Sequence, residues 1–365
     1  MNATNKKIRI IAFLLGAMVL LAVFLSTVTA PKNSPSPTER KNMVIDLAND
    51  ITQRNNRWFA IDINEATNSD FGSAFYVAQQ LGINFDTLHV TWKQLEPAPG
   101  QFNPEPNYLA IANAFYPPQN LPLVLTVGVI DMATNVLPND LKNQPLSSPE
   151  VQQRFKQLLD FIFLSLKDTT VAAISIGNEI DLGLRTADDW ENYRAFFRVA
   201  ADHIHSISPQ TRVGVKMRFA ALLGDQKDNA RQLTELSDVV MVTYYPEDEN
   251  KKYSQPSRVG TDFDQLTAMY PDKPIYILEA GFPTADKLDS SEYNQALFIH
   301  ELFTAWDKHH TQIPLISFLR LHDWQSSEAP GVYGAFLKSL GLRTAAGEPK
   351  VGFYQLEAEL QARGW

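Results

Sequence analysis

Eight short runs rich in β-branched and aromatic residues alternate with amphipathic helical stretches along this chain. Two of the runs, residues 121–130 and 171–178, are almost continuously apolar, as is typical of parallel strands covered on both faces. Eight β/α units favour an α/β fold whose strands close into a single (β/α)₈ TIM barrel over an open doubly wound sheet. The other runs are residues 58–64, 85–92, 212–219, 239–245, 275–280 and 315–322.

The predicted helices lie between these runs and show the apolar periodicity of amphipathic helices. The clearest are residues 148–166, 188–207 and 290–309. Ser148 precedes Pro149, and this order predicts a helix that begins at Pro149 with Ser148 as its N-cap.

The N-terminal segment, residues 1–30, has the pattern of an export signal. Lys6, Lys7 and Arg9 precede an uncharged run at residues 10–30. This run is also long enough to span a bilayer, with its basic end inside. Pro31 would hinder cleavage before it, so a cleaved signal peptide and an uncleaved transmembrane anchor stay open as alternatives. Both predict an exported protein, extracellular or periplasmic.

A Pro- and Ser-rich stretch at residues 31–41 follows this segment and predicts a linker. The rest of the chain, residues 42–365, is predicted to form one domain, a size that a barrel with modest insertions reaches. A core of that size is stable without disulfides.

Composition narrows the classes of partner. The net charge is −9 and the pI about 5.3, which argues against a nucleic-acid partner and is compatible with a neutral ligand. The chain has no cysteine, which excludes thiol nucleophiles, disulfides and thiolate metal sites. Composition does not predict the oligomeric state.

Polar and aromatic side chains gather where the predicted strands end. In a barrel of this kind, functional residues sit at the carboxyl ends of the strands, whereas a purely structural core has little use for such groups there. The candidates are Asp62, His89, Trp92, Asp131, Asn178, Glu179, Tyr245, Glu279, His322 and Trp324.

Two of these candidates form a recognisable pair. The fourth run ends in Gly177-Asn178-Glu179, and the seventh carries Glu279 within "LEAGFP". Both features resemble the retaining glycoside hydrolases of clan A. Together with "DVVMVTYYP" at residues 238–246, they most resemble the endo-β-1,4-galactanase family.

The resemblance implies a catalytic (β/α)₈ domain that cleaves β-glycosidic bonds of a neutral oligo- or polysaccharide by double displacement. It implies that Glu179 is the acid/base and Glu279 the nucleophile. It also implies that Asn178 binds the sugar 2-hydroxyl and that Tyr245 hydrogen-bonds the nucleophile. Retaining enzymes hold the two carboxyl groups about 5 to 5.5 Å apart, and two strands across a small barrel suit that spacing. The carboxylates do the chemistry, so no cofactor and no metal is predicted.

Four further residues are predicted to bind substrate with less support from motifs. His89 stands where clan members carry an arginine, and a site role and a satisfied core histidine stay open. Trp324 is predicted to be an aromatic platform for a sugar ring. Trp92 is assigned to the site, and Asp62 would either bind a sugar hydroxyl or cap a barrel layer.

Three rival classes of function remain: a transglycosylase, a non-catalytic glycan-binding protein, and a barrel enzyme of another class, such as an aldolase or a metal-dependent hydrolase. A transglycosylase would use the same site, with a sugar hydroxyl in place of water. A non-catalytic glycan-binding barrel would be expected to lack one of the carboxylates or Asn178. An aldolase would need a lysine at a strand end, for which Lys216 is the candidate. A metal-dependent hydrolase would need clustered histidines, and His89 and His322 are too few.

Overall fold

The computed structural model describes residues 35–247, 252–253, 255–325 and 331–365. Every predicted run contains a strand, and the run at 212–219 is divided into two. The strands are β1 Trp58–Ile61, β2 Asp86–Thr91, β3 Leu123–Asp131, β4 Thr134–Asn135, β5 Val171–Asn178, β6 Arg212–Gly214, β7 Lys216–Arg218, β8 Val240–Tyr244, β9 Ile275–Ala280 and β10 Leu315–Phe318.

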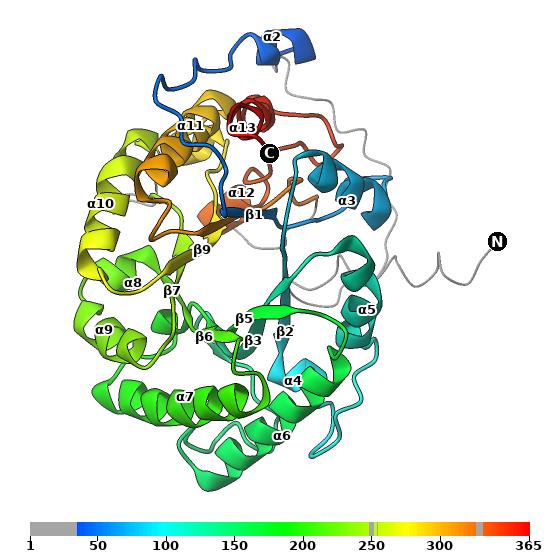
Figure 1. Cartoon of the computed structure of the whole chain (residues 1–365), viewed down its shortest axis with the longest axis vertical. Helices are drawn as coiled ribbons and strands as arrows, with labels where there is room; N and C mark the ends of the chain where they lie inside the picture. Colours follow the sequence, from blue (N-terminus) through cyan, green and yellow to red (C-terminus); the bar gives the residue numbers. More distant parts are fainter. Residues whose placement is uncertain (1–34, 248–251, 254, 326–330) are drawn as a thin grey trace, which may run out of the picture.

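Helices follow the strands and surround them (Figure 1). They are α3 Phe71–Gln80, α5 Tyr108–Phe115, α6 Pro149–Ser165, α7 Ala187–Ile207, α8 Phe219–Leu223, α9 Lys227–Glu235, α10 Val259–Met269, α11 Glu292–His309, α12 Gly331–Leu337 and α13 Val351–Ala362, with short α2 Pro37–Lys41 and α4 Trp92–Leu95. Single 3₁₀ turns lie at Pro117–Gln119, Ile180–Leu182, Pro256–Arg258 and Asp286–Leu288.

The strands form two parallel sheets with the orders β1-β10-β9-β8-β7 and β2-β3-β5-β6, and β4 adds an antiparallel edge to β3. Two interruptions separate the sheets. Val215 divides β6 from β7, and β1 and β2 lie in contact without ladder hydrogen bonds. The prediction of an α/β fold built on parallel strands is confirmed, and the strands form a ring inside the helices (Figure 1).

The helices form where the sequence offers caps and one apolar face. Ser148 is the N-cap of α6, with its hydroxyl accepting from the backbone of Val151, as predicted. Thr186 and Asp189 form a capping box at the start of α7. The buried face of α7 carries large side chains such as Trp190 and Phe197, and its burial against the strands stabilises the fold.

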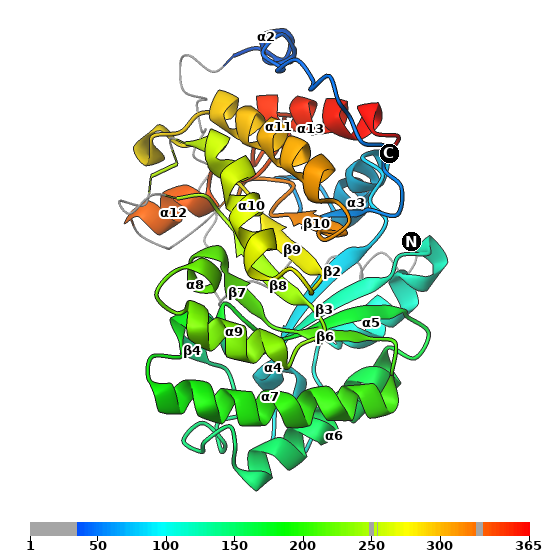
Figure 2. The same ribbon diagram turned by 60° about the vertical axis from the view of Figure 1, so that its left-hand side comes forward.

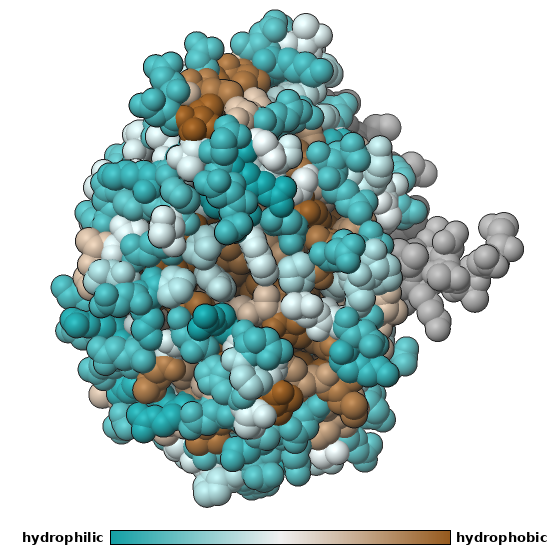
Figure 3. Space-filling view, viewed as in Figure 1, coloured by the Kyte–Doolittle hydropathy of each residue, from teal (hydrophilic) through white to brown (hydrophobic). Residues whose placement is uncertain are grey.

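Apolar side chains fill the end of the ring at which the strands begin. They include Phe85, Val124, Met241 and Leu315, which form one buried cluster. Figure 3 faces this end, and its centre shows hydrophobic surface among hydrophilic side chains. The opposite end, where the strands finish and where α12 and β4 lie, is at the left of Figure 2. Chemistry is therefore expected at that opposite end.

The ordered domain begins earlier than the predicted boundary at residue 42. Ser36 and Glu39 form a capping box, and α2 follows within the predicted linker. Arg40 is buried and pairs with Glu292 of α11 at 2.8 Å. The linker prediction rested on Pro and Ser content and overlooked the ion pair that holds α2 to α11. The signal or anchor at residues 1–30 lies outside the described residues. Within the described part of the chain, no helix is long and apolar enough to cross a membrane.

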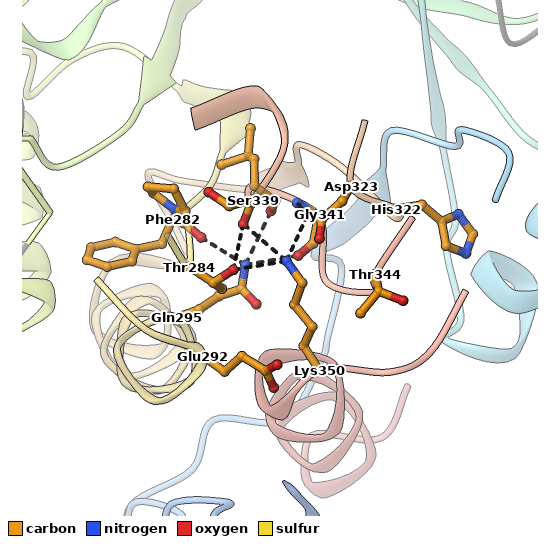
Figure 4. A network of polar contacts seen from close by, with 12 residues as sticks. Phe282, Thr284, Glu292, Gln295, His322, Asp323, Ser339, Gly341, Thr344 and Lys350 are labelled. Carbon is orange, nitrogen blue, oxygen red and sulfur yellow. Dashed lines mark hydrogen bonds and ion pairs between the residues drawn. The ribbon is translucent and has the colours of Figure 1, made fainter. Parts of the chain in front are cut away.

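A buried polar network fixes the segment that follows β10 (Figure 4). The ammonium of Lys350 lies 2.7 Å from Asp323 Oδ1 and 3.1 Å from both Thr284 Oγ1 and the Ser339 carbonyl. Burial lowers the pKa of Lys350 and raises that of Asp323 to about 6, and the ion pair opposes both shifts. Because the charges are paired and hydrogen-bonded, their burial is tolerated, and the chain on either side of Asp323 is held in place.

Candidate active site

Glu179 directly follows β5, in a turn that requires the preceding glycine. Gly177 has φ +96°, and a Cβ there would lie 2.5 Å from the side chain of Ile180. Glu179 itself is left-handed, with φ 44°. This turn leaves the carboxyl group buried, where its Oε1 accepts a hydrogen bond of 2.7 Å from the Thr243 hydroxyl.

Glu279 lies on β9 with both carboxylate oxygens occupied. Lys216 of β7 donates to Oε1 at 2.7 Å. Tyr245, which follows β8, donates to Oε2 at 2.8 Å. The contact between Tyr245 and Glu279 is the one that the family resemblance implies. A cation and a hydroxyl on one carboxylate favour its ionised form.

Thr243 brings the two glutamates into one site. It is the register partner of Glu279 across the pairing of β8 with β9, and its hydroxyl reaches Glu179. Side chains at paired positions of neighbouring strands lie side by side. The two carboxyl groups also interact electrostatically: the negative charge of Glu279 raises the pKa of Glu179.

His89 and Asn178 lie near each other because both approach the carboxylate of Asp131. Asn178 donates to Asp131 Oδ1 at 2.9 Å, and His89 Nε2 lies 3.6 Å from Asp131 Oδ2. Burial, followed by the charge of Lys216, lowers the pKa of His89 to about 4, so its imidazole is neutral near pH 7. His89 Nε2 and Asn178 Oδ1 are buried without a hydrogen-bond partner among the described residues. Buried polar atoms without a hydrogen-bond partner are rare in folded proteins, and packing alone does not explain these two.

Arg320, which follows β10, lies between Asp62 and Trp324 and interacts with both. The Arg320 guanidinium lies 4.7 Å from the centre of the Trp324 ring, and its Nε lies 3.6 Å from Asp62 Oδ2. Burial raises the pKa of Asp62, while Arg320 lowers it and Glu279 raises it further. Asp62 therefore belongs to the electrostatic surroundings of Glu279, and Trp324 is a partly exposed ring beside them.

Residues 150–308 match the model of glycosyl hydrolase family 53, which is somewhat less than half of the chain. The match includes both glutamates. The chain is a glycoside hydrolase. The family match agrees with the galactanase-like motifs, and the family belongs with the clan A fold. No curated protein matches the chain at a significant level.

Solved glycosidase structures share the fold of this enzyme. A GH5_18 variant from Bifidobacterium longum subsp. longum ATCC 55813, in complex with Manβ1-4GlcNAc, has a TM-score of 0.67 and 12% identity over 84% of this chain and 79% of that chain. GH5_18 from Streptomyces cattleya in complex with GlcNAc gives 0.66 and 15% over 86% and 81%. An exo-β-1,4-mannosidase from Opitutaceae bacterium strain TAV5 gives 0.62 and 17% over 80% and 54%.

The two glutamates of this glycosidase have opposite electrostatics. Burial and the negative charge of Glu279 raise the pKa of Glu179 to about 7, although Thr243 opposes the shift. Burial also acts to raise the pKa of Glu279, but Lys216 and Tyr245 outweigh it and hold that pKa below its ordinary value. At neutral pH, Glu279 is therefore ionised and Glu179 is close to half protonated.

The assignment of Trp92 to the site is wrong. Trp92 is fully buried as the first residue of α4, where its indole donates to Glu96 at 2.6 Å and packs 5.0 Å from Phe155. Its position at the end of a predicted strand was misleading because the chain turns into α4 one residue earlier. Glu96 is structural, since it also accepts from the backbone of Gly100. His322 is buried too, with Nδ1 2.6 Å from the Asn64 carbonyl.

Three residues of the site had no assigned role in the sequence-based prediction. Lys216 was considered only as the lysine of a rival aldolase, and Thr243 and Arg320 were not considered. Thr243 lies inside an otherwise apolar run, and a polar residue within such a run is a signal that could have identified it. Lys216 stands between apolar Val215 and Met217, but Arg212 and Arg218 in the same run obscure that signal. No cluster of three or more His, Asp or Glu side chains suited to a metal ion occurs in the described ranges.

Proposed function

We propose that the enzyme is a retaining β-glycosidase in which Glu179 is the acid/base and Glu279 the nucleophile. The observation that carries the proposal is a buried Glu179 with a raised pKa and a half-buried Glu279 with a lowered pKa, linked through Thr243. A retaining mechanism needs one protonated and one ionised carboxyl group on the two sides of the scissile bond.

In the first step, Glu279 attacks the anomeric carbon while Glu179 transfers its proton to the leaving-group oxygen. The glycosidic bond breaks and an ester between the sugar and Glu279 forms. In the second step, Glu179 is ionised and takes a proton from water, whose oxygen attacks the anomeric carbon and releases Glu279. Lys216 and Tyr245 keep Glu279 ionised and oriented throughout. A sugar hydroxyl in place of water would give transglycosylation.

The proposed substrate is a neutral β-linked glycan. Asn178, Asp62 and His89 would bind hydroxyl groups of the sugar that is attacked, and Trp324 would stack on its apolar face. The family match supports β-1,4-galactan as the first polymer to test, and the fold relative described as an exo-β-1,4-mannosidase supports β-mannosides as the second. Export of the enzyme, through residues 1–30, belongs to this proposal.

Wild-type enzyme is expected to release sugar with the β configuration from an aryl β-galactoside or β-mannoside. Proton NMR of the first product, before it mutarotates, distinguishes this result from inversion. Activity should fall as pH rises through about 7, where Glu179 loses its proton, and again in acid below the ordinary carboxyl range, where Glu279 gains one because its pKa is lowered. An initial α product would contradict the proposal.

Replacing Lys216 by methionine is expected to move the acidic limb of the kcat/KM profile to higher pH. Without the ammonium, the effect of burial is less opposed, and it raises the pKa of Glu279. Because Lys216 also lowers the pKa of Glu179, the basic limb should move in the same direction. Lys216→Arg keeps the charge and serves as the control, with its acidic limb near that of the wild type. An unmoved acidic limb in Lys216→Met would argue against an electrostatic role.

A further inference from the structure

The turn that carries Glu179 lies where the ring of strands is interrupted. The parallel pairing of β5 with β6 ends at Ser175 and Gly214, and β7 belongs to the other sheet. Glu179 follows β5, yet its carboxyl group reaches Thr243 on β8, the strand beyond β7. The placement of Glu179 therefore depends on the contacts that join its turn to β7 across this interruption.

Two side chains replace the backbone pairing at this point. The amide of Lys216 donates to the Ser175 hydroxyl at 2.8 Å, and that hydroxyl donates to the Gly177 carbonyl at 2.7 Å. The amide of Arg218 donates to Asp181 Oδ1 at 3.1 Å. Amides two residues apart on a parallel strand point to the same side, and buried amides need acceptors. Ser175 and Asp181 thus supply the acceptors that a neighbouring strand supplies elsewhere.

Asp181 is the charged member of these two links. It is the second residue of the 3₁₀ turn Ile180–Leu182, which directly follows Glu179. Its side chain is fully buried, and Arg218 Nε donates to its Oδ2 at 2.7 Å. Gln226 donates to its carbonyl at 3.1 Å. Because the amide and the side chain of one arginine bind both oxygens, the carboxylate is held in a single orientation.

Strand β7 therefore contacts the surroundings of both glutamates. Lys216 and Arg218 are two residues apart on it, so their side chains lie on one face of the strand. Lys216 binds Glu279 directly, whereas Arg218 binds Asp181 within the turn of Glu179. A retaining enzyme needs its two carboxyl groups at a defined separation. A strand that is bonded to both sides fixes that separation.

We propose that Asp181 is a positioning residue, which holds the acid Glu179 in place through its bonds to Arg218. This inference rests on the proposed function, since it takes Glu179 as the acid. Asp181 acts through the turn and does not touch the substrate. Its loss lowers the rate of the steps in which Glu179 transfers a proton, because proton transfer needs close and aligned groups.

The test compares two substrates of Asp181→Asn. Asparagine keeps the shape and an acceptor for the Arg218 amide, but it is neutral and cannot accept from Nε with its NH₂ group. We expect kcat/KM for an unactivated β-linked oligosaccharide, which needs the proton of Glu179, to fall about tenfold. A dinitrophenyl glycoside needs no such proton, so its kcat/KM should change much less. Asp181→Ala removes both acceptors and should lose roughly 100-fold on the oligosaccharide alone.

The ratio of the two kcat/KM values separates positioning from stability. It does not depend on the fraction of enzyme that is folded, so a variant that is merely less stable keeps the wild-type ratio. Asp188→Asn is the matched control, because Asp188 is exposed in the first turn of α7. It should hydrolyse both substrates like the wild type.

Asp181→Asn should also move the basic limb of the oligosaccharide pH profile to lower pH. It removes a negative charge that raises the pKa of Glu179, and it leaves the Arg218 cation without its partner. The other charged or titratable groups around Glu179 stay in place, and they are Lys216, Glu279, Tyr245, Tyr253 and Tyr333.

A wild-type ratio in both Asp181 variants would overturn the inference, as would a basic limb that does not move to lower pH. Glu179→Ala is the reference for the proposed function. If that variant lost equal activity on the two substrates, Glu179 would not be the acid, and the proposed function would fail instead. The two failures are therefore distinguishable.

Discussion

Replacing Glu279 by alanine is expected to lower kcat for an aryl β-glycoside by about 10⁴-fold or more, because no other group can form the glycosyl ester. The substitution removes the carboxylate that Lys216 and Tyr245 orient and leaves a space where it stood. Steady-state hydrolysis of the aryl glycoside measures the loss. Glu191→Ala, at an exposed position on α7, is the control and should keep full activity.

Azide gives this prediction a stereochemical readout. A small anion in the space left by Glu279→Ala can attack the anomeric carbon from the side of the missing carboxylate. Glu179 is still present to assist the leaving group, so turnover should recover and yield the α-glycosyl azide, with inverted configuration. Full activity without azide, or rescue that yields the β-azide, would refute the assignment of Glu279.

The loss of activity on replacing Glu179 by alanine is expected to depend strongly on the leaving group of the substrate. Hydrolysis of an unactivated β-linked oligosaccharide should fall by about 10³-fold or more, because its leaving oxygen needs the proton. A dinitrophenyl glycoside leaves without that help, so its glycosyl-enzyme should form and then accumulate, since no base activates water. The measurement is a burst of dinitrophenol followed by slow turnover.

Azide also distinguishes the acid/base role of Glu179 from the nucleophile role of Glu279. It needs no base, so it should attack the accumulated ester and raise the slow rate of Glu179→Ala. The product is the β-glycosyl azide, because two displacements restore the configuration. The basic limb of the pH profile, near pH 7 in the wild type, should also disappear. Retention of that limb, or normal oligosaccharide hydrolysis, would exclude Glu179 as the acid/base.

Much of the fold was predictable because its elements depend on local patterns. The apolar run that became β5 and the Ser148–Pro149 helix start are both properties of short stretches of chain. The failures also had local causes. Trp92 continued the residue pattern of β2. Thr91, however, is the N-cap of α4 at that point, so the indole of Trp92 points into the core. The composition of residues 31–41 concealed the helix α2, whose Arg40 is held by a distant glutamate.

The site was predictable only in its motif residues. Glu179, Glu279 and Asn178 end or follow strands and carry the resemblance to clan A. Lys216 could not be assigned because its role depends on a partner 63 residues away, two strands along the sheet. For the same reason the sequence did not indicate Thr243, which joins the site only because its hydroxyl reaches Glu179 from a neighbouring part of the sheet.

The sequence by itself determined the alternation of strands and helices and the presence of two glutamates at strand ends. Periodicity and backbone chemistry act over a few residues, so they can be recognised from the sequence alone. Only the tertiary structure decided that Glu279 is paired with a cation and Glu179 is not. The pKa of a buried carboxyl group depends on desolvation and on charges a few ångströms away, and these arise when distant strands meet.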